Sequence, residues 1–166
     1  TIEWQGGRGT ITDGTTLLDG LKTLYGDNVQ YDAEANFTGK AEVGIVVVAE
    51  EPYAEGEGDR DDLILAEADT QLIIKMREQC DTLILVIYSG RPIIISHVSD
   101  KCDAIVAAWL PGSEAQAIAP ALSGDVPFTG KLPFTWIKSM EQLPQAILPS
   151  SETPQWALGH GLTLQQ

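Results

Sequence analysis

The sequence predicts an α/β fold built on a mostly parallel sheet. Residues 42–50, 82–88 and 104–110 are predominantly apolar, and the first of these runs is rich in β-branched residues, as strands covered on both faces are expected to be. Segments with the apolar spacing of helices lie before, between and after these runs. Strands that alternate with helices form β-α-β units, and the strands of such units run parallel.

The remaining elements can be placed in order along the chain. Residues 15–26 carry a helical stripe of leucines, and Gly26 is placed to cap the C-terminus of that helix. Residues 28–32 are a candidate for a short strand, and residues 70–80 have the pattern of a second helix. A third helix is expected to begin near Gly112 or Ser113 and to bend or end at Pro120. Loops are expected after residue 123.

We expect residues 1–166 to form one domain, which is long enough to bury a substantial core. The chain begins at Thr1 rather than Met, so we expect it to be a processed or excised piece of a longer protein. No signal peptide is visible, and no apolar run reaches the roughly 18 residues that a membrane span requires.

The net charge narrows the classes of partner. With 24 acidic and 10 basic side chains the formal net charge is −14. Because nucleic acids and anionic membranes are themselves polyanions, this charge argues against both and favours a neutral or cationic ligand.

Cys80 and Cys102 have similar surroundings, each three residues before the apolar body of a predicted strand. If those strands are parallel neighbours, the two side chains lie close enough for a disulfide, and two free thiols are an equally good interpretation. Two cysteines are too few for a cysteine-rich zinc site. His97 and His160 lie far apart in sequence, and structural roles suit them better than metal binding. We therefore predict neither a metal site nor a cofactor.

Each predicted strand is followed by a distinctive loop. Residues 50–62 contain seven carboxylates and one arginine, residues 89–92 read "SGRP", and residues 111–114 read "PGSE". In open parallel sheets, ligands bind beyond the carboxyl ends of the strands. These loops are therefore expected to share one rim, which is the candidate site.

The acidic loop "YAEGEGDRDD", residues 53–62, has two interpretations. A run of charges is usually a solvated turn. However, Gly56 and Gly58 allow the backbone to bend sharply and approach a ligand. Crowded carboxylates also raise one another's pKa, and a glutamate that stays protonated near neutral pH can act as a general acid.

Several motifs together resemble a known family. "VGIVVVAEEPYAEGEGDRDDLIL", "LVIYSGRPIII", "AAWLPGSE", "GKLPFTW" and "GHGL" occur in the order found in the second, C-terminal domain of glycoside hydrolase family 3. The resemblance is to the exo-β-glucanases and β-glucosidases of that family. It implies a three-layer α/β/α sandwich with a mostly parallel six-stranded sheet. It also implies a secreted or periplasmic enzyme that releases glucose from the non-reducing ends of β-glucans with retention of configuration.

The resemblance also implies a partner domain and site residues. The family's first domain is a (β/α)8 barrel that carries an aspartate nucleophile, and 166 residues cannot hold such a barrel, typically ~250 residues, as well. This chain would supply the general acid/base. Glu55 matches the family pattern best and Glu57 is the alternative. Tyr53, Asp59 and Arg60 would shape the loop or lie near the substrate. Asp59 and Arg60 could form an ion pair within the loop, and two exposed charges of little energetic consequence are an equally good interpretation.

A different class of function remains as the alternative. A non-catalytic carbohydrate-binding module would bind glucan on an exposed aromatic platform, and the candidate side chains are Trp4, Trp109, Trp136 and Trp156. A flavodoxin-like nucleotide binder is disfavoured, because "GDVPFTGKL" does not have the spacing of a phosphate-binding loop.

Overall fold

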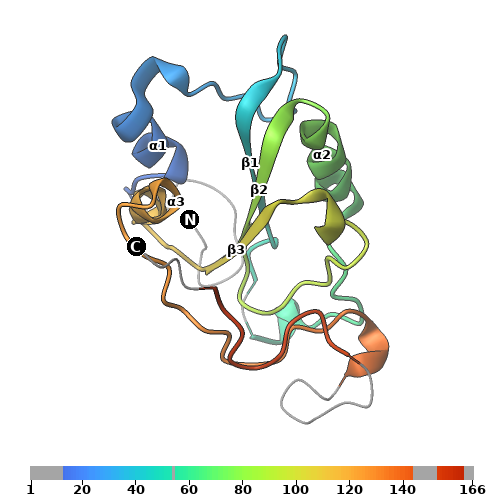
Figure 1. Cartoon of the computed structure of the whole chain (residues 1–166). Coiled ribbons are helices and arrows are strands. Elements are labelled where there is room, and N and C mark those ends of the chain that lie inside the picture. Colours follow the sequence, from blue (N-terminus) through green and yellow to red (C-terminus); the bar gives the residue numbers. More distant parts are fainter. Residues whose placement is uncertain (1–12, 54, 144–152, 163–166) are drawn as a thin grey trace.

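The computed structural model describes residues 13–53, 55–143 and 153–162, and Trp4 lies outside them. Three parallel strands form one sheet in the order β1-β2-β3: β1 is Ala41–Ala49, β2 is Cys80–Tyr88 and β3 is Ala104–Trp109. Three α-helices accompany them: α1 is Leu17–Tyr25, α2 is Glu67–Arg77 and α3 is Ala119–Ser123 (Figure 1). The α/β class and the parallel sheet are therefore confirmed.

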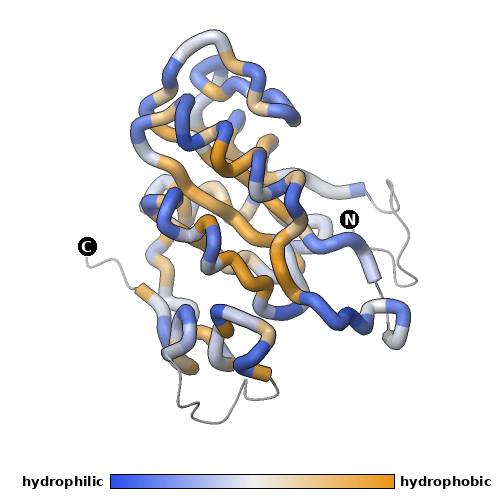
Figure 2. Tube along the Cα trace, turned by 90° about the vertical axis from the view of Figure 1, so that its right-hand side faces the viewer, coloured by the Kyte–Doolittle hydropathy of each residue, from blue (hydrophilic) through white to orange (hydrophobic). Residues whose placement is uncertain are grey.

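The helices cover both faces of the sheet, so the domain has three layers. Alternate side chains of β2 point to opposite faces, as the period of a strand requires. Leu83, Leu85 and Ile87 pack in the cluster that contains Ile73 and Met76 of α2. Val86, together with half-buried Ile84 and Tyr88, packs in a second cluster with α1 and α3. Figure 2 shows the apolar strands inside and the polar helix surfaces outside.

The predicted number of strands does not match this structure. The described part of the chain forms three strands where the resemblance implied six. Residues 28–32 do not form the expected short strand: Asn28 ends a 3-10 turn at Gly26–Asn28, and residues 29–32 are irregular. Tyr31 in this segment is 67% exposed, so burial does not favour a paired strand there.

Helix α1 lies within the predicted residues 15–26 and ends at the predicted cap, Gly26. The Thr16 hydroxyl accepts a hydrogen bond from Asp19 N at 3.1 Å, and the Asp19 carboxylate accepts one from Thr16 N at 2.8 Å. This reciprocal capping box satisfies two backbone donors at the helix start. Gly26 follows the last helical residue with a φ of 56°, a conformation that glycine adopts readily.

The expected role of Pro120 was wrong. Residues 115–118 form a 3-10 turn, and α3 starts at Ala119, which places Pro120 in its first turn. Proline suits that position because the first backbone N–H groups of a helix have no intrahelical partner. Pro120 therefore helps to start this helix and does not end it.

Both cysteines are free in the structure. Ile84 pairs with Ala104 across β2 and β3, an offset of 20 residues that places Cys102 level with Thr82. Cys80 is two residues further back, roughly 6.6 Å along the strand, in addition to the ~4.8 Å between strands. Such a separation exceeds the Cα distance that a disulfide spans. Burial raises the pKa of the Cys102 thiol to about 11.

The described chain after α3 is largely irregular, as predicted, but it contains a buried contact. Trp136 and Trp156 form an antiparallel bridge, and the orange and red segments run together in Figure 1. Trp136 is 1% exposed, and its indole N–H donates to the Ile93 carbonyl at 2.8 Å.

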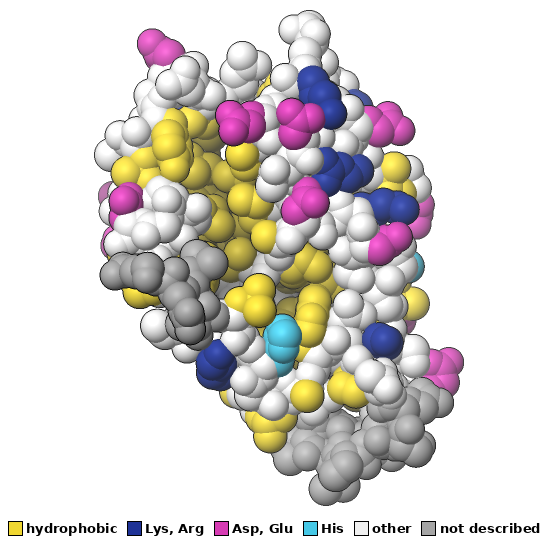
Figure 3. Space-filling view, viewed as in Figure 1, with side chains coloured by type: hydrophobic (Ala, Val, Ile, Leu, Met, Phe, Trp, Pro, Cys, Tyr) yellow, Lys and Arg dark blue, Asp and Glu magenta, His cyan; other side chains and the backbone are white. Residues whose placement is uncertain are grey.

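Strand β1 is an edge of the described sheet, and part of its surface is open. Val43 and Val47 of β1 are 48% and 40% exposed, and Leu24 and Tyr25 of α1 are similarly accessible. Figure 3 shows an apolar area on the face of the molecule seen in Figure 1.

None of the described helices is long and apolar enough to cross a bilayer.

Candidate functional site

The loops that follow the three strands lie on one rim, as predicted. Ala49 pairs with Tyr88, and Tyr88 pairs with Trp109, so all three strands end at the same level. Glu50 N donates to the Tyr88 carbonyl at 3.0 Å, and Ser89 N donates to the Trp109 carbonyl at 3.1 Å. Backbone hydrogen bonds thus continue past the strands and fix where each loop begins.

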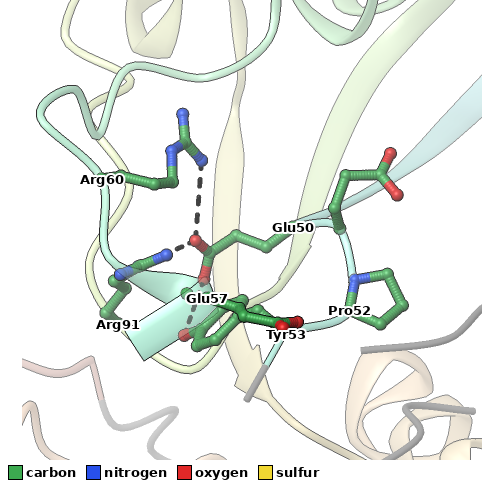
Figure 4. Close-up of a pocket in the computed structure, with 8 residues that line it drawn as sticks. Glu50, Pro52, Tyr53, Glu57, Arg60 and Arg91 are labelled. Carbon is green, nitrogen blue, oxygen red and sulfur yellow. Dashed lines mark hydrogen bonds and ion pairs between the residues drawn. The ribbon is translucent and has the colours of Figure 1, made fainter. Parts of the chain in front are cut away.

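Glu50 is the first residue after β1, and its carboxylate is the centre of the site. Its side chain is only 6% exposed, and Arg91 Nε donates to it at 2.8 Å. An Arg60 guanidinium nitrogen lies 3.7 Å away, and the backbone N–H of Gly90 donates at 3.3 Å. Figure 4 shows the two arginines converging on this carboxylate. Such partners are required because a buried charge without them is strongly destabilising.

Tyr53 packs against the same group. Its hydroxyl donates to Glu50 at 3.3 Å, and the guanidinium carbon of Arg91 lies 4.4 Å from the centre of its ring. Burial, and then the negative charge of Glu50, raise the pKa of the Tyr53 phenol. The ring lies against Gly58 and near Gly90, so that a β-carbon on either glycine would collide with it. Gly58 and Gly90 are therefore required by close packing around Tyr53.

Glu55 and Glu57, the two predicted acid/base candidates, lie on a 3-10 turn at Glu55–Gly58. Glu57 is exposed and borders a small cavity of about 130 Å³ that Glu50, Tyr53, Arg60 and Arg91 also line. The side chain of Glu55 lies outside the described part of the structure.

Arg60 does not pair with Asp59 in the described residues, and the alternative interpretation of an exposed charge fits Asp59. Arg60 instead faces the Glu50 carboxylate and donates to the Ile64 carbonyl at 3.4 Å. Asp59 is exposed, so its charge keeps its hydration, whereas the buried Glu50 depends on cationic partners. The contacts of Arg60 therefore join the beginning of the loop, at Glu50, to its end, at Ile64.

Sequence reasoning missed Glu50 and Arg91 as a pair. The sequence pattern did not single out Glu50 within the acidic loop, and Arg91 is noticed only as part of "SGRP". A signal was available, since both follow adjacent parallel strands, and one is a cation while the other is an anion. The register that brings them together is a tertiary feature.

The two histidines lie apart from this site. His97 Nε2 is 3.1 Å from the Thr70 hydroxyl, and the His160 ring stacks on Trp156. Over residues 13–53, 55–143 and 153–162, no group of three His, Cys, Asp or Glu side chains is arranged to hold a metal ion.

The described tryptophans do not form the exposed platform that a binding module would need. Trp136 is buried, and it packs against both Trp109 and Trp156, with ring centres 6.1 Å and 5.7 Å apart. Trp109 also meets Phe134 edge to face, 5.5 Å between ring centres. A shallow hollow of about 440 Å³ lies beside Trp109 and Phe134, and Gly90 is part of its wall.

Fold and site together describe an α/β domain with an acidic loop at the carboxyl end of a parallel sheet. The family model "Glycosyl hydrolase family 3 C-terminal domain" matches residues 1–164, so the chain belongs to this family. It is 32% identical over 145 residues to the periplasmic beta-glucosidase of Salmonella typhimurium, covering 81% of this chain and 19% of that protein. It is 29% identical over 159 residues to the lysosomal beta glucosidase of Dictyostelium discoideum, covering 82% of this chain and 19% of that protein.

Solved structures agree with this assignment. A variant of the exo-1,3/1,4-beta-glucanase from a Pseudoalteromonas species superposes with a TM-score of 0.86 and 31% identity, covering 97% of this chain and 28% of that one. A beta-glucosidase from Listeria innocua shares the fold, with a TM-score of 0.71 and 18% identity over 91% of this chain and 26% of that one. The chain thus spans about a fifth of the length of the curated relatives it matches.

Proposed function

We propose that this chain is the acid/base-donating domain of a retaining exo-β-glucanase or β-glucosidase that releases glucose from the non-reducing ends of β-glucans. The observation that carries the proposal is the glutamate-bearing turn at Glu55–Gly58, held at the carboxyl end of β1 by the contacts of Tyr53 and Arg60 with Glu50. The kinship with beta-glucosidases and an exo-beta-glucanase supports the choice of substrate.

In this mechanism Glu55 acts twice, with Glu57 as the alternative residue. As a general acid it protonates the glycosidic oxygen while a carboxylate nucleophile attacks the anomeric carbon and forms a glycosyl-enzyme. As a general base it then takes a proton from the water that hydrolyses this intermediate. In retaining enzymes the two carboxyl groups lie about 5–5.5 Å apart.

The nucleophile belongs to a different domain in this proposal. A (β/α)8 barrel that is not contained in these 166 residues would supply an aspartate and the other wall of the substrate pocket. The chain alone would therefore be inactive. A secreted or periplasmic location is consistent with a relative that is named as periplasmic.

The test uses the enzyme in which this domain is joined to its barrel. We expect Glu55→Gln to reduce turnover of an aryl β-glucoside by about 10²–10⁴-fold, the usual contribution of acid/base catalysis, with recovery in azide. Glu57→Gln is the matched variant on the same turn and should lose far less. Mild and equal effects at both positions would disprove the assignment. Hydrolysis by the purified 166-residue chain would refute the need for a second domain.

A further inference from the structure

We infer that Glu50 is a positioning residue for the acid/base turn and acts through Arg91 and Tyr53. The inference rests on the proposed function, because it concerns the same loop. It assigns a role to a carboxylate that does not itself meet the substrate in that proposal, and it explains why a charge is buried at this point of the rim.

The first step is the fixed position of Glu50. Its backbone is held by the hydrogen bond from Glu50 N to the Tyr88 carbonyl, at 3.0 Å, which extends the ladder between β1 and β2. Its side chain is 6% exposed and has donors from the next loop, Arg91 Nε at 2.8 Å and Gly90 N at 3.3 Å. Charge-assisted bonds of this kind are among the strongest hydrogen bonds in proteins. Glu50 is therefore a rigid point between two strands.

The second step is the attachment of both ends of the turn to that point. Before the turn, the Tyr53 hydroxyl donates to Glu50 at 3.3 Å. After the turn, an Arg60 guanidinium nitrogen lies 3.7 Å from the same carboxylate. The turn Glu55–Gly58, which carries both acid/base candidates, thus lies between two contacts with one side chain.

The third step is the confinement of the Tyr53 ring. Arg91 covers one face at 4.4 Å from the ring centre, while Gly58 and Gly90 leave no room for a β-carbon beside it. Arg91 therefore has two contacts, one with Glu50 and one with Tyr53, and Figure 4 shows these groups together. A planar guanidinium can donate along its edge and stack on its face at once, which an ammonium cannot do.

The consequence is kinetic. Removing the Glu50 charge frees both ends of the turn without removing the acid/base itself. A misplaced general acid slows reactions whose leaving group needs a proton, and it leaves reactions with a good leaving group nearly unaffected. A purely structural role would slow both kinds of reaction alike, because it would lower the amount of folded enzyme.

The experiment uses the enzyme in which this domain is joined to its barrel. It measures kcat/KM, which reports the glycosylation step, for laminaribiose, whose leaving group needs a proton, and for 2,4-dinitrophenyl β-glucoside, whose leaving group does not. For Glu50→Gln we expect a loss of at least about 10-fold on laminaribiose and less than about threefold on the dinitrophenyl substrate. Arg91→Lys should give the same pattern, because lysine keeps the charge but not the stacked, two-sided contact. Asp61→Asn, which neutralises an exposed carboxylate of the same loop, is the matched control and should change neither value.

Each outcome has a defined meaning. Equal losses on both substrates, or none on either, would overturn the inference. If Glu50→Gln does not fold, Tyr53→Phe removes only the hydroxyl that donates to Glu50, and it must show the same leaving-group dependence. Glu55→Gln and Glu57→Gln are measured in parallel. If the loss of kcat/KM in one of these variants depends on the leaving group, and the loss in the Glu50 variant does not, the inference alone fails. If neither Glu55→Gln nor Glu57→Gln shows a loss that depends on the leaving group, the proposed function fails and the inference fails with it.

Discussion

The ring of Tyr53 lies directly against the backbone of Gly58, in the space that a side chain on residue 58 would occupy. Both residues belong to the acidic loop, and the contact closes the short turn that carries Glu55 and Glu57. The absence of a side chain at residue 58 is therefore a packing requirement, and it gives the first prediction.

Gly58→Ala is expected to lower the free energy of unfolding by about 1–3 kcal/mol, the usual cost of overpacking. The new methyl group must displace either the Tyr53 ring or the loop backbone. Gly56→Ala is the control on the same turn, because a β-carbon there meets no other atom within 4 Å. Urea unfolding of the two variants measures the difference. Equal stability of both would show that the Tyr53–Gly58 contact is not a constraint.

Trp136→Phe is expected to destabilise the chain by about 2–4 kcal/mol. The indole is 1% exposed and donates to the buried Ile93 carbonyl at 2.8 Å, so phenylalanine leaves both a cavity and an unpaired acceptor. Trp156→Phe, at a half-buried position on the opposite side of the same bridge, should cost clearly less. Thermal unfolding followed by circular dichroism compares the two, and the reverse order of stability would contradict this account of the C-terminal packing.

Asp103 is expected to make stability depend on pH in the acid range. Its carboxylate accepts a hydrogen bond from Leu83 N at 2.7 Å and one from Arg77 at 2.6 Å. The Leu83 N–H first, and Arg77 next, lower the pKa of Asp103 below its ordinary value of 3.8. A carboxyl group whose pKa is lower in the folded than in the unfolded state stabilises the fold above the unfolded pKa. That contribution is lost as the pH falls through the folded pKa.

The measurement compares the wild-type chain with Asp103→Asn in urea unfolding. The difference in unfolding free energy should be largest at about pH 6 and should shrink below about pH 4. Asp61→Asn makes the same change of charge at an exposed position, so it shows how much the unfolding free energy changes from the loss of one charge alone. A difference between wild type and Asp103→Asn that does not change with pH would rule out the ionised carboxylate as its source.

The two thiols are expected to stay reduced and to react slowly. Intact mass spectrometry should give the mass of the chain with both hydrogens present on Cys80 and Cys102. Burial raises the pKa of Cys102 to about 11 and also raises that of Cys80, so little thiolate is available at neutral pH. Iodoacetamide should modify the native chain slowly and the unfolded chain rapidly. A mass lower by two hydrogens, or rapid labelling of native protein, would contradict the structure.

The local pattern of residues predicted much of the fold. The three apolar runs became β1, β2 and β3. The expected burial on both faces holds for the central strand β2 but not for β1, whose Val43 and Val47 are 48% and 40% exposed. Gly26 ends α1 as predicted, and the Thr16–Asp19 capping box, which the sequence analysis did not single out, starts it. Both caps depend on neighbours within a few residues. Pro120 and residues 28–32 were misjudged, because the surrounding chain decides whether a proline starts or ends a helix and whether a short segment finds a partner strand.

By itself, then, the sequence determined the class of fold, the parallel sheet and the rim on which the acidic loop lies. Only the tertiary structure decided which charges on that rim meet. Residues 50 and 91 are 41 positions apart, and the pairing of Ala49 with Tyr88 brings their loops together. Register also separates Cys80 from Cys102, and the folding of the acidic loop back on its first residue brings Arg60 to Glu50. The physical reason is that ion pairs and disulfides need contact within a few ångströms, and such contact depends on how strands are aligned rather than on which residues are neighbours in sequence.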